Sequence, residues 1–559
     1  MHRLFQFKGG VVLKEHKKES TALPVQPAKL PPTLTLPLKQ HIGVPAEPVV
    51  AVGDKVLKGQ LIAHAGDTLS APLHAPSSGT VIAIADHPIP HPSGMSAPCI
   101  IIETDGEERW RPRQRSVFNF TELSAQALRE IIRDAGIVGL GGAGFPAAVK
   151  LNPNGHEIET LILNGAECEP YITCDEMLLR EHALEVLAGL LMMRHAVNAQ
   201  RCIIAIENNK PQAFRALQEE VRNTGADVEL VEVPTIYPTG SEKQLIQVLT
   251  GKEVPSGGLP LDIGMVCHNV GTAYAVYRAV ELDQPLISRY VTIAGSVAHA
   301  RNLEVLIGTP LGSLIEECGG NRHTLRRVIV GGPMMGTAMH SDAVPVVKTT
   351  NCILVESAMH DVPLPSRDEY AMPCIRCGNC AKACPVNLLP QQMYWYARAR
   401  DFDKIQDYNL FDCIECGCCD YVCPSQIPLV GYYRYAKSEI WNQEAEKRQA
   451  DLARERHQFR EFRLEREKKE RAERHKKKRS AVAKGGSDEK KAAIEAAMAR
   501  VRAKKAEQDS APKNTDNLTP AQQKQVEEAN ARRQAQQGEE SPAKSTEENP
   551  AANTQDRPQ

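Results

Sequence analysis

The spacing of hydrophobic and polar residues divides the chain into segments of different kinds. Short β-branched runs, broken by Gly-Asp, Lys-Gly and Ser-Gly turns, fill residues 49–85 and predict a small β sandwich. From about residue 120 to 285, apolar runs such as Leu161–Asn164 and Arg201–Glu207 alternate with helical stretches such as Glu181–Arg194. Strands separated by helices predict a doubly wound parallel sheet.

Two further kinds of segment follow. Residues 286–350 show the order strand, strand, helix, strand, which is typical of a small β-grasp unit, and Gly331–Pro333 predicts a tight turn rather than a phosphate cradle. From Trp441 onward the chain is rich in charged residues and has too little apolar surface to form a core. Residues 441 to about 506 could form a solvated helix through i,i+4 charge pairs, and we expect the rest to be disordered.

The whole pattern predicts a multidomain chain of α/β and α+β type. We expect five regions: an N-terminal β-sandwich lobe (1–115), an α/β domain (120–285), a β-grasp unit (286–350), a cysteine-rich domain (365–435) and a charged tail (441–559).

Composition and charge exclude several classes of protein. The chain has 559 residues, and a hydrophobic fraction of 42% is enough for several cores. Its 67 Lys and Arg against 69 Asp and Glu argue against a general nucleic-acid binder. Residues 441–559 hold 28 basic and 22 acidic residues, so the tail carries +6 and the preceding body −8.

The apolar runs are too short for a membrane span. The longest, Val186–Met193, is well below the roughly 20 residues that crossing a bilayer needs. The first residues lack the apolar core of a secretory signal, so we expect the chain to stay in the cytoplasm. Cysteines are kept reduced there, which favours metal or redox ligands over disulfides.

The strongest chemical signal is a repeated cysteine run. Cys374–Pro385 (CIRCGNCAKACP) and Cys413–Pro424 (CIECGCCDYVCP) both follow the spacing C-x2-C-x2-C-x3-C-P. Three thiolates of such a run bind one cubane and the fourth reaches a second cluster, so the pair predicts two [4Fe–4S] clusters in a helical ferredoxin domain. The expected ligands are Cys374, Cys377, Cys380 and Cys423 for the first cluster, and Cys413, Cys416, Cys419 and Cys384 for the second.

Structural zinc is the alternative interpretation of these cysteines. Zinc needs four ligands per ion and seldom uses paired three-plus-one runs followed by proline. Cys418 lies out of register with the repeat, and we expect it to pack beside a cluster without binding it. The residues between the runs have helical spacing and predict an inserted helix pair.

A glycine-dense segment points to phosphate chemistry. Gly136–Lys150 (GIVGLGGAGFPAAVK) lies at a predicted junction of loop and helix, where backbone N–H groups can approach a phosphate closely. Alone this is a weak signal, because glycine-rich turns are common. Three more segments accompany it: Asn164–Asp175, Tyr237–Gly251 and Cys267–Thr272.

Together, and in this order, these four segments resemble the flavin- and NADH-binding subunit of respiratory complex I. The resemblance implies non-covalent FMN and NADH as substrate. Over residues 1–440, the order of a lipoyl-like lobe, this domain, a β-grasp unit of SLBB type and two ferredoxin runs resembles the C subunit of the Rnf (or Rsx) electron-transport complexes. The lobe has no lysine between Lys58 and Lys150, so it lacks an attachment point for a swinging cofactor arm.

The resemblance also implies roles for individual residues. Lys150 would neutralise the flavin phosphate or bond the reduced ring, and Glu242 would lie beside the nicotinamide; these two are the implied catalytic residues. The implied FMN contacts are Gly139, Gly141, Gly142, Gly144, Lys150, Asn164, Tyr237, Gly240, Asn269 and Thr272, and the implied NADH contacts are Phe145, Glu167, Glu169 and Glu242.

Three positions depart from the complex I pattern. Leu140 stands where that subunit has arginine, Ala166 where it has aspartate, and Ser241 where it has glutamate. It therefore stays open whether this chain binds the flavin or the nucleotide more weakly than complex I does, or in a different way. The single-cluster cysteine motif of that subunit is also absent, and the two-cluster domain is expected to take its role.

The predicted function is that of a peripheral, NADH-oxidising subunit of a membrane-bound, ion-translocating oxidoreductase of the NADH:ferredoxin type. NADH donates two electrons at once, and a flavin can pass them singly to iron–sulfur clusters. The resemblance implies integral-membrane subunits and a ferredoxin-like subunit as partners, on the cytoplasmic side of the bacterial inner membrane.

Two alternatives from other classes stay open. One is an iron–sulfur adaptor with an empty nucleotide fold and no hydride chemistry, which the three departures would fit. The other is a tethering protein that binds anionic lipid or nucleic acid through basic residues of the tail, such as Arg474–Arg479.

Overall fold

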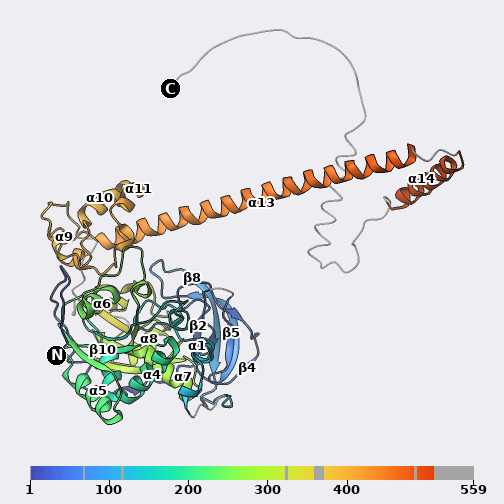
Figure 1. Cartoon of the computed structure of the whole chain (residues 1–559). Coiled ribbons are helices and arrows are strands. Elements are labelled where there is room, and N and C mark those ends of the chain that lie inside the picture. Colours follow the sequence, from blue (N-terminus) through green and yellow to red (C-terminus); the bar gives the residue numbers. More distant parts are fainter. Residues whose placement is uncertain are drawn as a thin grey trace, which may run out of the picture. The chain divides into compact units, whose positions relative to one another are not determined.

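The computed structural model describes residues 2–66, 69–114, 119–321, 325–357, 371–483 and 488–508 (Figure 1). The chain forms two compact units, Met1–Glu446 and Lys447–Gln559. Among the described helices, none combines the length and apolar character that crossing a membrane requires.

The N-terminal lobe contains the predicted β sandwich. One sheet has the order β2-β8-β7-β4 and the other β3-β5-β6, and all their pairings are antiparallel. Leu36, Ile62, Ile100 and Ile102 are buried together in its core. The strands are β2 (Thr33–Pro37), β3 (Glu47–Pro48), β4 (Lys55–Val56), β5 (Leu61–His64), β6 (Leu73–His74), β7 (Gly79–Pro88) and β8 (Ser96–Thr104).

A parallel four-stranded sheet forms the centre of the α/β domain. Its order is β11-β10-β9-β12, and both of its faces are apolar and covered by helices. Leu245 and Leu249 of α6 pack on one face, and α4 and α7 pack on the other. The strands are β9 (Thr160–Gly165), β10 (Arg201–Glu207), β11 (Glu229–Val233) and β12 (Met265–Asn269).

The helices of this domain confirm the predicted doubly wound architecture. They are α1 (Ala125–Asp134), α2 (Ala147–Lys150), α3 (Cys174–Glu181), α4 (Ala183–Val197), α5 (Pro211–Thr224), α6 (Glu242–Thr250) and α7 (Val270–Glu281), with 3-10 turns at Phe120–Glu122 and Pro260–Ile263. The chain passes from β9 through β10 to β11 on one side, and β12 then returns to the other side of β9. The strand order therefore reverses between β9 and β12, and ligands of open α/β sheets bind at this kind of position.

The β-grasp region is larger than predicted. Its six-stranded sheet has the order β1-β14-β13-β17-β15-β16. β17 lies beyond the predicted end at residue 350 and pairs with β13 and β15, so the boundary 286–350 is too short. The elements are β1 (Gln26–Pro27), β13 (Ser288–Gly295), β14 (Arg301–Leu306), α8 (Leu311–Glu317), β15 (Leu325–Val330), β16 (Thr337–Met339) and β17 (Cys352–Ser357).

The cysteine-rich domain is helical, as predicted, and includes the inserted helix pair α10 and α11. Figure 1 shows α9, α10 and α11 grouped near the start of α13. Tyr433, Ala436 and Ile440 of α13 are buried in this domain, so its packing extends past the predicted boundary at residue 435. The helices are α9 (Asn379–Ala383), α10 (Pro390–Ala399), α11 (Phe402–Asp407), a 3-10 turn (Leu410–Asp412), α12 (Cys418–Tyr421) and α13 (Leu429–Ala483).

The tail is helical where the structure describes it. α13 continues through the charged sequence to Ala483, and α14 covers Asp488–Gln508. Their side chains in the second unit are exposed almost throughout, which fits a solvated helix. The predicted disorder of the final segment concerns residues 509–559, which lie outside the described residues.

An N-terminal strap, residues 2–21, leaves the sandwich and runs over the other domains. Phe5 N donates to Val248 O at 2.9 Å, Gly10 N donates to Ala383 O at 3.0 Å, and Val11 forms a bridge with Tyr237. The region 1–115 thus includes a segment outside the sandwich, because its first residues pack on the α/β and cysteine-rich domains. The strap connects these two domains directly.

Candidate functional site

A pocket of about 300 Å³ lies where the strand order reverses. The carboxyl ends of β9 and β12 supply Asn164 and Asn269, and α6 begins at its edge with Glu242. We call it the switch-point pocket. Predicted residues in its wall are Gly139, Gly141, Phe145, Lys150, Asn164, Glu167, Glu169, Tyr237, Gly240, Glu242 and Asn269.

Three predicted residues lie beside this wall rather than on it. Gly142 has a φ of 108° and open space at the position of a Cβ, and Gly144 has a φ of 67°. Both conformations favour glycine, so these residues shape the loop. Thr272 is fully buried, and its Oγ1 accepts a hydrogen bond from Leu140 N at 3.0 Å. We therefore assign Thr272 to support of the glycine loop.

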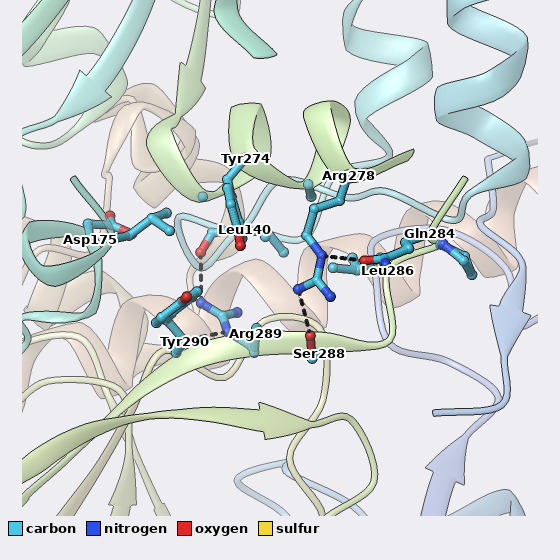
Figure 2. A pocket seen from close by; sticks show the side chains of 13 residues that line it. Leu140, Asp175, Tyr274, Arg278, Gln284, Leu286, Ser288, Arg289 and Tyr290 are labelled. Atoms are coloured by element: carbon cyan, nitrogen blue, oxygen red, sulfur yellow. Dashed lines mark hydrogen bonds between the residues drawn. The ribbon is translucent and has the colours of Figure 1, made fainter. Parts of the chain in front are cut away.

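The glycine loop is held from behind by a buried arginine. Arg289 Nη2 donates to Leu140 O at 3.2 Å, and Arg289 Nη1 donates to Lys348 O. Figure 2 shows Arg289 and Leu140 facing a small cavity that Arg278 also borders. The helix that follows the loop, α2, is a single turn, so the predicted phosphate site at a helix N-terminus gains little from it. The backbone N–H groups of the loop itself remain the better hydrogen-bond donors to a phosphate.

The two implied catalytic residues form a direct ion pair. Lys150 Nζ lies 2.8 Å from Glu242 Oε1, and both side chains are about one-third exposed in the pocket. At this exposure the pair adds little to stability. Either side chain is free to exchange its partner for a ligand.

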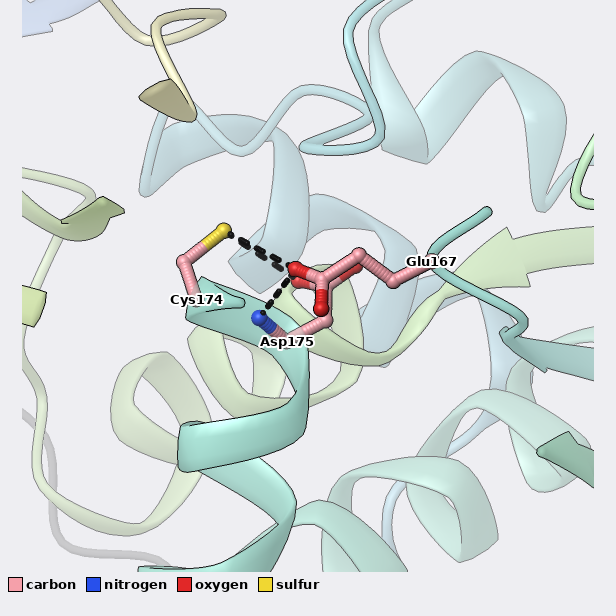
Figure 3. Close-up of side chains that lie close together, drawn as sticks. All are labelled: Glu167, Cys174 and Asp175. Carbon is pink, nitrogen blue, oxygen red and sulfur yellow. Dashed lines mark hydrogen bonds between the residues drawn. The ribbon is translucent and has the colours of Figure 1, made fainter. Parts of the chain in front are cut away.

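Glu167 caps the start of α3 (Figure 3). Its Oε1 accepts hydrogen bonds from Asp175 N at 2.8 Å and from the Cys174 thiol at 3.5 Å. Burial raises the pKa of the Glu167 carboxyl. These three side chains have the composition of a metal site. The backbone donors and Lys17 Nζ, 3.9 Å away, indicate a helix cap instead.

Glu169 is also engaged by the protein. It accepts hydrogen bonds from Met335 N at 2.7 Å and Met334 N at 3.3 Å, in the turn that Gly331–Pro333 begins. This turn is the tight turn that the sequence predicted, and Met335 lines the pocket. Burial raises the pKa of Glu169 to about 7. Glu167 and Glu169 thus shape the pocket through contacts that the sequence does not reveal.

Lys17 of the strap holds the loop that carries both glutamates. Its Nζ donates to the backbone oxygens of Glu167 at 2.7 Å, Glu169 at 3.0 Å and Ile172 at 2.5 Å. No sequence signal marked this residue, because its partners lie about 150 positions further along the chain.

His268 is the most informative residue that the sequence analysis missed. It lies one position before Asn269, is 4% exposed, and its Nε2 has no hydrogen-bond partner among the described residues. Burial lowers its pKa well below the usual value, so the ring is neutral. A neutral ring with an unused polar atom in the pocket wall fits a polar ligand such as FMN. Its position at a strand end, next to Asn269, was the available signal.

Other unpredicted residues also face the pocket. Ala166 and Ser241, two of the departures from the complex I pattern, are among them, whereas the third departure, Leu140, is buried beneath the loop. The remaining wall residues are Ala143, Cys168, Ile172, Asp175, Pro238, Cys267, His268, Met335, Asn351, Ile414 and Cys416.

Four cysteines converge on a second cavity, the cysteine cavity. Cys384 from the first run meets Cys413, Cys416 and Cys419 from the second, and the other lining residues are mostly apolar. This donor set is the one expected for the second cluster and fits a [4Fe–4S] group. Cys418 is fully buried but does not line the cavity.

The remaining cysteines gather on the solvent side. Burial raises the pKa of the Cys380 thiol, and the Cys423 and Cys377 thiols raise it further. Cys374 is partly exposed and Cys377 is exposed. The influence of Cys423 on Cys380 fits the exchanged pattern, in which Cys423 joins the first-run set.

The switch-point pocket and the cysteine cavity share a wall. Cys416 and Ile414 line both. Tyr237, 3% exposed, donates a hydrogen bond from its hydroxyl to Cys416 O at 2.6 Å. The two sites are therefore joined by direct contacts rather than by solvent.

Family comparisons agree with this arrangement. Residues 5–107 match the family described as RnfC barrel sandwich hybrid domain, 132–278 the Nuo51 FMN-binding domain, 290–338 the SLBB domain and 373–427 the 4Fe-4S dicluster domain. The last match favours iron–sulfur clusters over zinc. Fold and site together define an electron-transfer protein that binds FMN and [4Fe–4S] clusters.

Relatives over most of the chain share one name. The C subunit of the ion-translocating oxidoreductase complex of Pseudomonas aeruginosa is 49% identical over 84% of this chain and 60% of its own length. The protein of the same name from Serratia proteamaculans is 45% identical over 90% of this chain and 70% of its own length. The chain belongs to this family of C subunits, and it spans 60 to 65% of the length of the first relatives.

Among solved structures, an NAD+-reducing [NiFe]-hydrogenase in the H2-reduced state aligns with a TM-score of 0.41 and 20% identity. The alignment covers 58% of this chain and 65% of that chain. This overall likeness is too low to add to the family assignment.

Proposed function

We propose that this chain oxidises NADH and passes the electrons onward, as a peripheral subunit of a membrane-bound, ion-translocating oxidoreductase of the NADH:ferredoxin type. The supporting observation is Cys416, which lines both the switch-point pocket and the cysteine cavity. Conversion of a two-electron donor into single electrons needs a flavin and a cluster in close contact. The shared wall supplies that contact.

When bound, FMN accepts a hydride and releases electrons singly, and the clusters carry them. The chain's own residues bind and orient the flavin and the nicotinamide. Lys150 supplies positive charge for a phosphate or the reduced ring, and Glu242 supplies a carboxylate for the nicotinamide side. The Lys150–Glu242 ion pair, 2.8 Å long, opens when a ligand takes either partner.

The burial of the cysteines gives the proposed path a direction. Cys384, Cys416 and Cys419 are buried beside the pocket, whereas Cys377 of the other set is exposed. The second-run set would therefore hold the cluster nearer the pocket, and the first-run set would hold the one nearer the solvent, where a partner could accept an electron. As partners we propose integral-membrane subunits and a ferredoxin-like subunit, on the cytoplasmic side of a bacterial inner membrane.

NADH titration of the anaerobically purified full chain tests the proposal. NADH is expected to bleach flavin and cluster absorption in the wild type. Lys150→Ala and Glu242→Gln should slow this bleaching about tenfold or more while dithionite still reduces the clusters. Lys252→Ala is the matched control, because Lys252 pairs with Glu159 at 3.0 Å outside the pocket wall.

Unchanged NADH bleaching in both pocket variants would contradict the assigned roles. Bleaching by dithionite but not by NADH in the wild type would favour the iron–sulfur adaptor without hydride chemistry.

A further inference from the structure

An aromatic groove lies beside Cys374, a partly exposed cysteine of the first run. Met372, Cys374, Trp395, Arg398, Tyr432 and Tyr435 are among the residues that line it. Cys374 is an expected ligand of the first cluster, so the groove reaches the thiolate end of that site. The walls come from the first run, from α10 and from the start of α13.

The groove is unusually apolar for an exposed surface. Met372 is 64% exposed, Trp395 39% and Tyr435 37%, and neighbouring Ile375 is 68% exposed. Single exposed apolar residues are ordinary, but a group of them next to a functional site marks an interaction surface. Aromatic residues, methionine and arginine are also the types enriched where proteins meet.

The rim of the groove is positively charged. Arg398 lies over the Trp395 ring at 5.9 Å, and Arg400 lies over the Tyr435 ring at 6.0 Å. Arg376 and Lys382 are exposed on the first run itself. Within the described residues, none of these four cations forms an ion pair with a carboxylate. Asp401, the adjacent acid, accepts a hydrogen bond from Lys404 N as the cap of α11.

We propose that the aromatic groove docks an acidic one-electron carrier protein. The apolar centre, the cationic rim and the partly exposed Cys374 together match the surface that a transient redox partner needs. Redox encounters bury little area and depend on charge steering, so a cationic rim favours a partner with a negative surface around its own centre. The direction of electron flow rests on the proposed function, whereas the docking surface does not.

The transfer at this surface moves one electron and nothing else. The centre held by Cys374, Cys377, Cys380 and Cys423 is oxidised by one electron, and the iron–sulfur centre of the carrier is reduced by one. No bond forms or breaks, and no proton moves.

Stopped-flow mixing tests the proposal without NADH. The full chain with its cofactors is photoreduced and mixed with an oxidised acidic [2Fe–2S] ferredoxin as the probe. We expect the second-order rate constant to fall steeply with ionic strength, because salt screens a charge-steered encounter. The double variant Arg398→Glu/Arg400→Glu should lower the rate constant on the order of tenfold at low salt and flatten its salt dependence.

Two controls separate docking from general effects. Arg215→Glu/Arg222→Glu makes the same charge change on the exposed face of α5 and should leave the rate unchanged. Basic cytochrome c as the carrier should react faster, not slower, with the Arg398/Arg400 variant. Trp395→Ala should slow the ferredoxin reaction even at high salt, since it removes apolar contact. Iron content must equal that of the wild type in every variant.

Three results would overturn the proposal. One is an equal rate for wild type and the Arg398/Arg400 variant, and another is an equal loss in the α5 control. The third is a dimer of the chain in sedimentation that the groove variants dissolve, because a second copy would then occupy the groove. If NADH fails to reduce the clusters but photoreduced chain reacts as expected, the proposed function fails and the docking surface stands.

Discussion

The side chain of Lys348 ends where three domains meet. Its Nζ donates to Pro72 O of the sandwich lobe at 2.8 Å and to Gly136 O before the glycine loop at 2.7 Å. It is fully buried, and burial lowers its pKa to about 7. Near neutral pH, much of this amine is therefore uncharged and joins two domains as a donor of neutral hydrogen bonds.

This lowered pKa predicts a pH-dependent stability. Between pH 7 and the usual lysine pKa of about 10.4, the unfolded chain binds a proton that the folded chain does not. The contribution of Lys348 to the free energy of unfolding should therefore rise with pH in this window, by up to about 1.4 kcal/mol per pH unit. Lys348→Met should flatten the increase in melting temperature between pH 7 and 9.5. Lys252→Met, at an exposed site, is the control, and equal slopes for all three proteins would refute the assignment.

A second prediction concerns the exchanged cysteines. Cys384→Ala should damage the cluster of the second run, and Cys423→Ala that of the first, as seen in the EPR signals of the reduced chain. Cys418→Ala should keep both clusters, because Cys418 is buried outside the cysteine cavity. If each substitution affects only the cluster of its own run, the exchanged ligation is wrong.

Residue by residue, the sequence predicted what depends on local spacing. The cysteine runs could be interpreted because three ligands of each cluster lie three positions apart and the fourth cysteine follows four positions later in a repeated pattern. The contacts of Glu169 with Met334 and Met335, or of Tyr237 with Cys416, join residues more than 160 positions apart. The unpartnered ring of His268 is likewise a property of packing. No periodicity or motif carries such information.

At the scale of elements, α13 belongs to two regions of different character. Its first turns bury Tyr433 and Ile440, and Lys437 Nζ donates to Cys413 O at 2.8 Å. Beyond these turns the helix is exposed. The start of the helix therefore supports the second-run cysteines, although the same helix continues without interruption into the tail.

Two truncations of the full chain separate these regions. A chain ending at Glu446 should retain flavin, clusters and NADH oxidation, with at most some loss of salt-sensitive membrane retention. A chain ending at Pro428 should lose about half of its iron, because the second-run loop loses the hydrogen bond from Lys437 and α10 loses the one from Tyr433. Iron and flavin analysis after anaerobic purification measures both. Loss of iron in the longer chain would show that further residues of α13 are needed.

Element boundaries were harder to predict than element types. β1 has two residues and joins β14 of a distant sheet, and β17 pairs with β13 and β15. Strand length and pattern gave the sandwich and the parallel sheet correctly. Which sheet a short strand joins depends on its partners, so the predicted edge at residue 350 left out β17.

For the whole molecule, the predicted cofactor content is directly measurable. Two cubanes require about eight iron atoms per chain, together with one FMN. An iron chelator under reducing, mildly denaturing conditions should remove iron from the exposed first-run set before the buried second-run set. Zinc in place of iron in anaerobically prepared chain would contradict the cluster assignment. Loss of iron from both cysteine sets at the same rate would contradict the expected effect of their different burial.

The contacts of the N-terminal strap also have a consequence for folding during synthesis on the ribosome. Gly10 docks on Ala383, a residue that the ribosome adds about 370 positions later. At 5–20 residues per second, the strap waits roughly 20 to 75 seconds for this partner. During that time Val11, which packs beside Ala383, has no complete surface to cover it, whereas the partners of Phe5 and Lys17 emerge earlier. The strap is thus made long before its docking site and becomes fixed only after the first cysteine run has emerged.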